Sequence, residues 1–465
     1  MLARGRTAEH APALGSVVVT REGVATLARR GAWLGFVALV VLSPLRARFQ
    51  LMARPTVPVY SDFTDFLLFW SDIAAIATIG LWGLSLVFAR RRIWFGPRFL
   101  AWPVATLLVV AWLGVPFAVD VALAAYNALR LVFLVLLVLY VINEIDRLDR
   151  VVVPVGLMIV VQAVVGIGQV VGQKSLGLSD LGEHVLSPIL GVAVVTAHDG
   201  TRYLRAYGLS DHPNILGGLL AMALLLVGGA IALDRERRHT WRIVVFALGT
   251  AALLLTFSRG AWFGLLAGMV VMVGMLAMLR DRAALSRLGV ACMAGLIVAA
   301  PFVAPYRDVL EARTEASGQS AKDFRAVSER EAVSDATTHL VVDHPVLGVG
   351  IGTLPLAVKQ IRPSFAYHYE PASVVLLDVT AETGLVGGAA YIVLLVAPWL
   401  ALARHRRRWT GELAVASGAL AALTAVGLFD YYTWTYSSGR IWAWLVLGLW
   451  AAMYRKAVAG RHDAV

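Results

Sequence analysis

Long apolar runs separated by short polar segments dominate the chain. Twelve of these runs reach the roughly 17–25 residues that a helix needs to cross the hydrocarbon core of a bilayer. They lie at 31–48, 66–89, 99–117, 121–143, 151–172, 214–233, 243–258, 261–279, 288–305, 384–403, 411–430 and 438–454. The pattern predicts an all-α, polytopic membrane protein with about twelve transmembrane helices.

Composition supports a membrane protein and excludes a soluble globular one. Hydrophobic types make up 59% of the 465 residues and charged types 15%, whereas about a quarter of the residues of a soluble domain are charged. The single cysteine, Cys292, lies inside an apolar run. One cysteine permits neither a disulfide nor a zinc framework within the chain.

The net charge of +11 comes mostly from short basic clusters beside the apolar runs. They fall at every second junction, at Arg90 to Arg92, Arg147 and Arg150, Arg235 to Arg242, Arg280 to Arg287, and Arg404 to Arg408. Because positive residues favour cytoplasmic loops, this regularity predicts that both termini are cytoplasmic. We expect membrane lipids to be the contacts of these clusters. Nucleic acid is not expected, since no basic stripe is interleaved with aromatic residues.

The spans divide the chain into five parts. Two long loops fall on the side opposite to the basic clusters, and the second is the only sizeable polar segment of the sequence. We expect that 321–340 within it forms an amphipathic helix, and long structured loops usually carry function. The expected parts are a cytoplasmic tail at 1–30, a bundle at 31–305 with an external loop at 173–213, a large external loop at 306–383, three spans at 384–454, and a cytoplasmic tail at 455–465.

Two external arginines are candidate ligands of an anionic lipid. Arg205 begins the segment Arg-Ala-Tyr-Gly-Leu-Ser-Asp-His-Pro-Asn, and Arg259 lies in a Thr-Phe-Ser-Arg-Gly turn between two spans. Guanidinium groups are planar donors that suit phosphate, and a diphosphate leaving group gains most from fixed positive charge. The alternative is that each arginine reaches the membrane interface or caps helix carbonyls.

Arg130 lies deep in the fourth span. It falls roughly nine residues, or about 13 Å, into the predicted helix. An arginine at such depth usually faces a cavity or a charged partner. It could pair with Asp72 of the second span or contact a lipid phosphate, and the residues alone leave both open.

His368 is a candidate general base. It lies on the large external loop two positions before Glu370. A histidine beside a carboxylate can accept a proton from an incoming hydroxyl group. The alternative is an exposed loop histidine without a chemical role.

Several short motifs follow one another along the chain in a specific order. They are the Arg205 segment ending in Pro-Asn, the Ser-Arg-Gly turn, His344-Pro-Val-Leu-Gly-Val-Gly, and Ala381-Glu-Thr-Gly-Leu-Val-Gly. In order, spacing and sidedness, the chain resembles the O-antigen ligase and polymerase superfamily of Wzy-type membrane glycosyltransferases over about residues 120–450. The resemblance implies a GT-C-like fold in the inner membrane of a bacterium.

The resemblance also implies an activity. Such an enzyme would need neither metal nor cofactor and would work at the periplasmic or extracellular face. Its donor would be a glycan on undecaprenyl diphosphate. The acceptor would be a lipid A core sugar, a protein hydroxyl or another carrier-linked repeat unit. By resemblance, Arg205 and Arg259 match the arginines proposed to hold the donor diphosphate. Arg330 matches an arginine upstream of the Gly-Val-Gly segment.

The chain departs from this family's pattern at one place. Members commonly carry a His-Asn pair about nine residues before the glutamate of the Ala-Glu-Thr-Gly segment, and Ser373 and Val374 occupy those positions here. His368 could replace the missing base, a carboxylate such as Glu370 or Asp378 could do so, or activity could be altered or lost. The missing histidine favours a polymerase or another exopolysaccharide enzyme over a ligase.

Two other function classes remain as alternatives. A transporter or lipid flippase for the carrier-linked glycan would tend to show repeats and several polar residues near the midplane, and the sequence shows no repeat. A non-catalytic subunit of a polysaccharide assembly complex would fit the replaced His-Asn pair.

Overall fold

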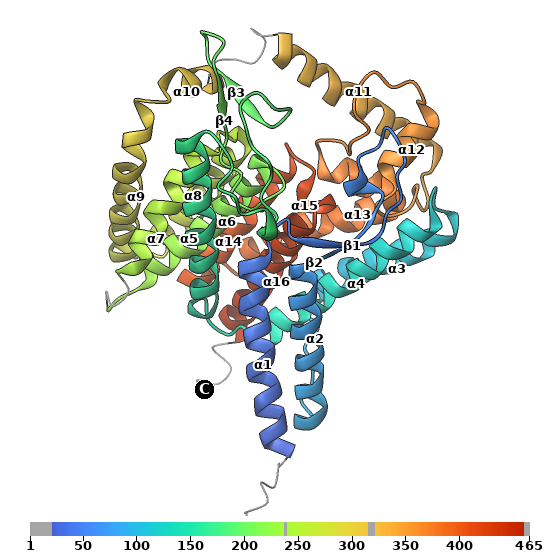
Figure 1. The fold of residues 1–465 in the computed structure, drawn as a ribbon. Helices are drawn as coiled ribbons and strands as arrows, with labels where there is room; N and C mark the ends of the chain where they lie inside the picture. Colours follow the sequence, from blue (N-terminus) through green and yellow to red (C-terminus); the bar gives the residue numbers. More distant parts are fainter. Residues whose placement is uncertain (1–20, 237–239, 315–320, 460–465) are drawn as a thin grey trace, which may run out of the picture.

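The computed structural model describes residues 21–236, 240–314 and 321–459 (Figure 1). The predicted tails fall partly outside these ranges, at 1–20 and 460–465. Helices make up most of the described chain, and its strands form two short antiparallel pairs.

A helix lies at each of the twelve predicted spans. Among the described residues, nine helices are long and apolar enough to cross a membrane. Of the other three, α7 and α14 are apolar but shorter, and α16 is long enough but is not among the nine. The all-α, polytopic membrane fold is therefore confirmed. The helices are α1 (Arg21–Leu42), α2 (Trp70–Ala89), α3 (Arg98–Gly114), α4 (Val121–Glu144), α5 (Asp149–Gly172), α6 (Pro213–Leu233), α7 (Trp241–Leu255), α8 (Arg259–Met278), α9 (Arg282–Val303), α13 (Val375–Arg404), α14 (Gly411–Gly427) and α16 (Ser437–Ala459).

The boundaries of the first two spans differ from the prediction. Helix α1 begins at Arg21 and ends at Leu42, because Pro44 disfavours helical backbone at the residue before it. The chain then forms strand β1 (Arg48–Met52), which pairs with β2 (Phe66–Phe69). Helix α2 consequently begins only at Trp70, where Asp72 accepts a hydrogen bond from the backbone nitrogen of Phe69 at 2.9 Å.

Helix α6 forms the centre of the bundle. Its apolar window is completely buried, and it packs against α5, α7, α8, α9 and α14. Glycines permit the close approach, since a Cβ at Gly229 would overlap the Val415 side chain. A fully buried helix holds its first turn firmly, which fixes Asn214 at one end of the bundle.

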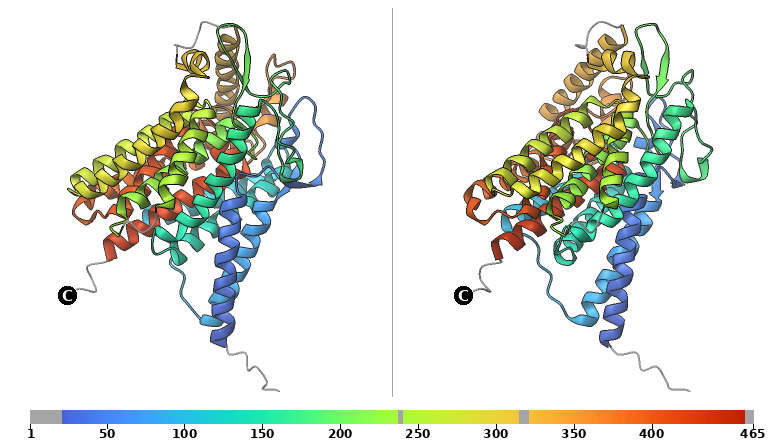
Figure 2. Two further views of the ribbon diagram at one scale, coloured as in Figure 1. Left: turned by 60° about the vertical axis from the view of Figure 1, so that its left-hand side comes forward. Right: turned by 90° about the vertical axis from the view of Figure 1, so that its left-hand side faces the viewer.

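The two long loops gather at that same end (Figures 1 and 2). The first contains strands β3 (Val194–Thr196) and β4 (Arg202–Leu204). The second contains α10 (Arg307–Thr314), α11 (Ala321–Asp343) and α12 (Leu354–Ile361), so the helix predicted at 321–340 is confirmed. The remaining short elements are α15 (Tyr432–Thr435) and the 3-10 turns Ser61–Phe63, Val115–Phe117, Ser179–Leu181 and Arg406–Arg408.

The two glycine-rich motifs dock on each other. Helix α13 is kinked at Gly384, whose φ of 72° and ψ of −178° lie in a region that essentially only glycine adopts. The kink admits the turn after α11, because Leu385 donates its backbone N–H to the Pro345 carbonyl at 2.8 Å. Val349 donates to the Ala381 carbonyl, also at 2.8 Å. This contact anchors the large loop on the bundle.

Candidate functional site

Two adjoining hollows lie beneath α11, where α6, α8 and α14 reach the end of the bundle. The first measures about 470 Å³ and the second about 310 Å³, within the range of ligand sites. Five residues line both hollows, namely Asn214, Arg330, Phe429, Asp430 and Tyr432. The hollows therefore form one candidate site with two compartments.

Helix ends position the polar residues of the first hollow. Asn214 is in the first turn of α6, where Pro213 starts the helix and His212 Nδ1 accepts the backbone N–H of Asn214 at 3.1 Å. Arg259 is the first residue of α8. Asp430 lies in the connection after α14, which ends at Gly427. A polar side chain at the end of a helix can lie outside the apolar part of the bundle while the helix still fixes the position of its backbone.

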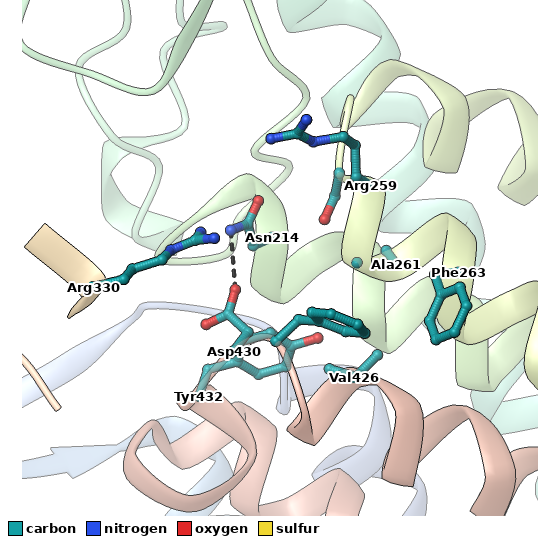
Figure 3. Close-up of a pocket in the computed structure, with 11 residues that line it drawn as sticks. Asn214, Arg259, Ala261, Phe263, Arg330, Val426, Asp430 and Tyr432 are labelled. Carbon is teal, nitrogen blue, oxygen red and sulfur yellow. Dashed lines mark hydrogen bonds between the residues drawn. The ribbon is translucent and has the colours of Figure 1, made fainter. Parts of the chain in front are cut away.

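Asn214 bridges Arg205 and Asp430. Arg205 Nη2 donates to Asn214 Oδ1 at 2.6 Å. Asn214 Nδ2 donates to Asp430 Oδ2 at 2.9 Å, as Figure 3 shows. Arg205 also donates from Nε to the Thr256 carbonyl at 2.7 Å and is only 4% exposed. It therefore lies behind the wall of the hollow, while Asn214 and Asp430 line it.

Arg259 and Arg330 are the cations of the first hollow. Figure 3 shows their side chains entering from opposite sides, Arg259 from α8 and Arg330 from α11. Both side chains are exposed. Within the described parts of the chain, neither guanidinium has a hydrogen bond or ion pair with a protein group. Both are consequently available to an anion.

Carboxylates line the second hollow. Tyr431 donates its hydroxyl to Glu370 Oε2 at 2.9 Å. Burial raises the pKa of Glu370, and the hydrogen bond from Tyr431 acts in the opposite direction. Withdrawal from bulk water raises the pKa of Asp430 to about 6, although Asn214 and Arg330 favour its ionised form. A carboxyl group with a pKa of about 6, as at Asp430, can exchange protons at physiological pH.

Asp211 completes this wall. It forms ion pairs with Arg46 at 3.2 Å and Arg48 at 3.5 Å. Both arginines belong to the segment that leads from α1 into the β1–β2 hairpin. The N-terminal part of the chain thus supports the second hollow.

His368 lies outside the lining of both hollows. Its Nδ1 is 3.0 Å from Glu329 Oε1, its ring stacks on Tyr60 with centroids 5.4 Å apart, and its side chain is 55% exposed. Ser373, which stands where the family pattern has histidine, does line the second hollow. Glu370 precedes it by three positions, so a carboxylate faces the same space as the replaced histidine position.

Arg130 belongs to a separate ion-pair network. It donates to Asp72 at 2.9 Å, to the Tyr126 hydroxyl at 2.7 Å and to Ser437 at 2.8 Å. It lines another, mostly apolar cavity of about 320 Å³ between α2, α4 and α16. Arg130 also lines a smaller cavity of about 50 Å³, whose lining shares Pro371 and Tyr436 with the second hollow. The structure therefore brings Arg259 and Arg330 together and places Arg130 outside the lining of both hollows.

Two polar residues were missed by the sequence analysis. Arg440 of α16 is 7% exposed and donates to Asn127 Oδ1 at 2.9 Å. It was overlooked because it falls near the start of a predicted span. Asp430 was overlooked as the last residue of an apolar run. An acidic residue at the end of an apolar run was the available signal.

A comparison with known protein families matches one segment of the chain. Residues 243–392 match the family model described as O-antigen ligase, which is about a third of the chain. The matched segment includes Arg259, Arg330 and Glu370. A comparison with curated proteins finds no match. The matched segment and the polytopic helical fold support the resemblance of the chain to the O-antigen ligase and polymerase superfamily of membrane proteins.

Proposed function

We propose that the protein is a glycosyltransferase that transfers or polymerises glycan units from an undecaprenyl-diphosphate-linked donor at the periplasmic or extracellular face. The acceptor is a hydroxyl of another glycan or of a lipid-linked glycan. The reaction needs neither metal nor cofactor, and the protein lies in the bacterial inner membrane with both termini cytoplasmic. The observation that carries the proposal is that a hollow lined by Arg259 and Arg330 adjoins a second hollow lined by Glu370, with Asp430 lining both.

The first hollow suits the donor diphosphate. Arg259 and Arg330 offer bidentate donors to phosphate oxygens and remain charged at every working pH. Apolar residues continue from these arginines toward the outside of the bundle. Phe263 and Phe429 are each 48% exposed, and both line the hollow. A polyprenyl chain can follow these rings into the bilayer while its diphosphate stays beside the arginines.

The second hollow suits the acceptor. Glu370 and Asp430 lie where an incoming sugar hydroxyl needs a general base. In the transfer, the acceptor oxygen bonds to the anomeric carbon as the bond from that carbon to the diphosphate oxygen breaks. The hydroxyl proton passes to a carboxylate, and the arginines stabilise the charge on the departing diphosphate.

Arg205 and Arg130 support this arrangement indirectly. Arg205 fixes Asn214, which in turn orients Asp430, so Arg205 is a positioning residue. Arg130 is held by Asp72 within the bundle and acts as a structural ion pair. His368 orders Glu329 at the rim of the second hollow.

The test is transfer by the purified, reconstituted protein from a synthetic polyprenyl-diphosphate-linked oligosaccharide. We expect Arg259→Ala and Arg330→Ala to lower the rate by about 100-fold or more, the usual effect of losing one charge-stabilising donor. Arg307→Ala is the matched control, because Arg307 is exposed on α10 and pairs only with Glu311 among the described residues. Wild-type rates in both cavity variants would rule out the proposal.

The replaced His-Asn pair supports a second candidate, a non-catalytic subunit of an assembly complex. In that case the purified protein would transfer nothing, while polysaccharide assembly in cells would still require it and would tolerate loss of Arg259 or Arg330. Translocation of the lipid-linked glycan in liposomes without transfer would instead indicate a flippase.

A further inference from the structure

Another cavity lies at the opposite end of the bundle, far from the candidate active site. It measures about 430 Å³ and is lined by α1, α4 and α5. Figure 2 shows that α1 and α2 extend beyond the rest of the bundle at this end. The main lining residues are three arginines, one carboxylate and two aromatic rings, namely Arg29, Arg30, Arg150, Glu144, Trp33 and Tyr140.

Glu144, the carboxylate that lines this cavity, already has hydrogen-bond and ion-pair partners within the protein. It accepts hydrogen bonds from Arg29 Nε at 2.6 Å and from Trp82 Nε1 at 2.9 Å, and it also pairs with Arg91. These contacts tie the α1–α2 hairpin to the end of α4. The carboxylate thus has no capacity left to neutralise the remaining arginines.

Positive charge is therefore in excess around the cavity. Arg150 pairs with the exposed Asp146 at 3.2 Å and donates to the Glu144 carbonyl at 2.7 Å. Arg30 has neither a hydrogen bond nor an ion pair with any described residue. Counting Arg29 and Arg91 as well, four arginines face two carboxylates.

The aromatic residues in the walls of the cavity favour an anion that also has an apolar part. Trp33 and Tyr140 belong to a cluster of aromatic rings around Phe36, deeper in the bundle than the arginines. An occupant in contact with both regions carries negative charge at one end and an apolar chain at the other. Basic pockets between helices at the end of a membrane span match this chemistry.

We propose that this cavity binds the headgroup of an anionic phospholipid from the leaflet at that end of the bundle. Its phosphate lies between Arg30 and Arg150, and an acyl chain runs along Trp33 and Tyr140. The lipid fills the space between α1 and α4. It thereby holds the hairpin that leads, through β1, to Arg48 and Asp211 at the other end. This site is independent of the proposed glycan transfer.

The test is native mass spectrometry of the protein released from nanodiscs of equimolar phosphatidylglycerol and phosphatidylcholine. We expect the wild type to retain phosphatidylglycerol preferentially. Arg30→Gln should weaken that retention about fivefold, the factor that corresponds to about 1 kcal/mol per arginine near a membrane surface. Arg30 has no described partner to lose, so the variant should fold normally.

Arg21→Gln is the matched control. Arg21 is exposed on the same helix and does not line the cavity. Equal retention of both lipids by the wild type, or equal weakening in the two variants, would overturn the proposal by showing only diffuse attraction. Displacement of the lipid by millimolar inorganic phosphate would also overturn it, because the apolar walls would then contribute nothing.

Discussion

Asn214 donates a hydrogen bond to Asp430 at 2.9 Å and so joins the start of α6 to the connection after α14. The two residues lie 216 positions apart in the chain. Arg205 holds the amide oxygen of Asn214, which fixes the amide orientation that presents a donor to Asp430. The ionised form of Asp430 is favoured by this contact.

The first prediction concerns pH. If ionised Asp430 accepts the acceptor proton, the transfer rate should rise as pH increases through about 6, the raised pKa of this carboxyl. Asn214→Ala removes a donor that favours ionisation, so the rise should move to higher pH. Transfer rates measured from pH 5 to 8 test both expectations. An unchanged profile in Asn214→Ala would show that Asp430 is not the titrating group.

The second prediction concerns stability. The pKa of Asp430 is higher in the folded protein than its ordinary value of 3.8. Ionisation therefore costs stability, and this cost appears as pH rises from about 4 to above 6. We expect Asp430→Asn to raise the melting temperature by a few degrees at pH 8 and to have little effect at pH 4. Thermal unfolding in detergent at both pH values measures this difference, and equal effects at the two would contradict it.

The third prediction separates the two candidate bases on the large loop. Glu370 lines the second hollow, whereas His368 is largely exposed and outside it. Glu370→Gln should lower the transfer rate at least about tenfold, since general-base catalysis typically contributes 100-fold or more. His368→Ala should lower it by less than about threefold. The reverse order would assign the base to His368.

The fourth prediction concerns Arg130 and Asp72. Asp72→Ala leaves a guanidinium unpaired within the bundle and should cost roughly 3 kcal/mol of stability. The double variant Asp72→Leu with Arg130→Met removes both charges and should restore most of the melting temperature and of the transfer rate. A stable double variant without activity would instead indicate that Arg130 contacts substrate.

The fifth prediction concerns the kink in α13. Alanine at Gly384 would adopt a strained backbone, and its Cβ would overlap the Val346 carbonyl oxygen. We expect Gly384→Ala to destabilise the protein by on the order of 2 kcal/mol or more. Gly289→Ala in α9 is the control, because a Cβ there meets no atom within 4 Å. Fluorescence-detected size-exclusion after heating compares the two variants.

The apolar runs were sufficient to predict where the apolar helices lie, and the scarcity of helix-breaking residues predicted the helix at 321–340. Burial of a long apolar run in a bilayer depends on local composition, so the sequence alone determines it. The β1–β2 hairpin was missed because its residues continue an apolar run, and strand pairing depends on a partner elsewhere in the chain.

The residues of the candidate site also fall into two groups, those that the sequence identified and those that only the tertiary structure identified. Arg259 and Arg330 were identified from short motifs, because such motifs record which residue types occur and in what order. Their separation from Arg130, the position of Arg205 behind Asn214 and the recruitment of Asp430 depend on contacts between distant helices. A polar side chain near the end of a span can face lipid, water or another helix, and the packing of the bundle decides which. The sequence thus determined that this is a multi-span membrane protein with arginines at the ends of its spans, and the tertiary structure decided which of them share a cavity with carboxylates.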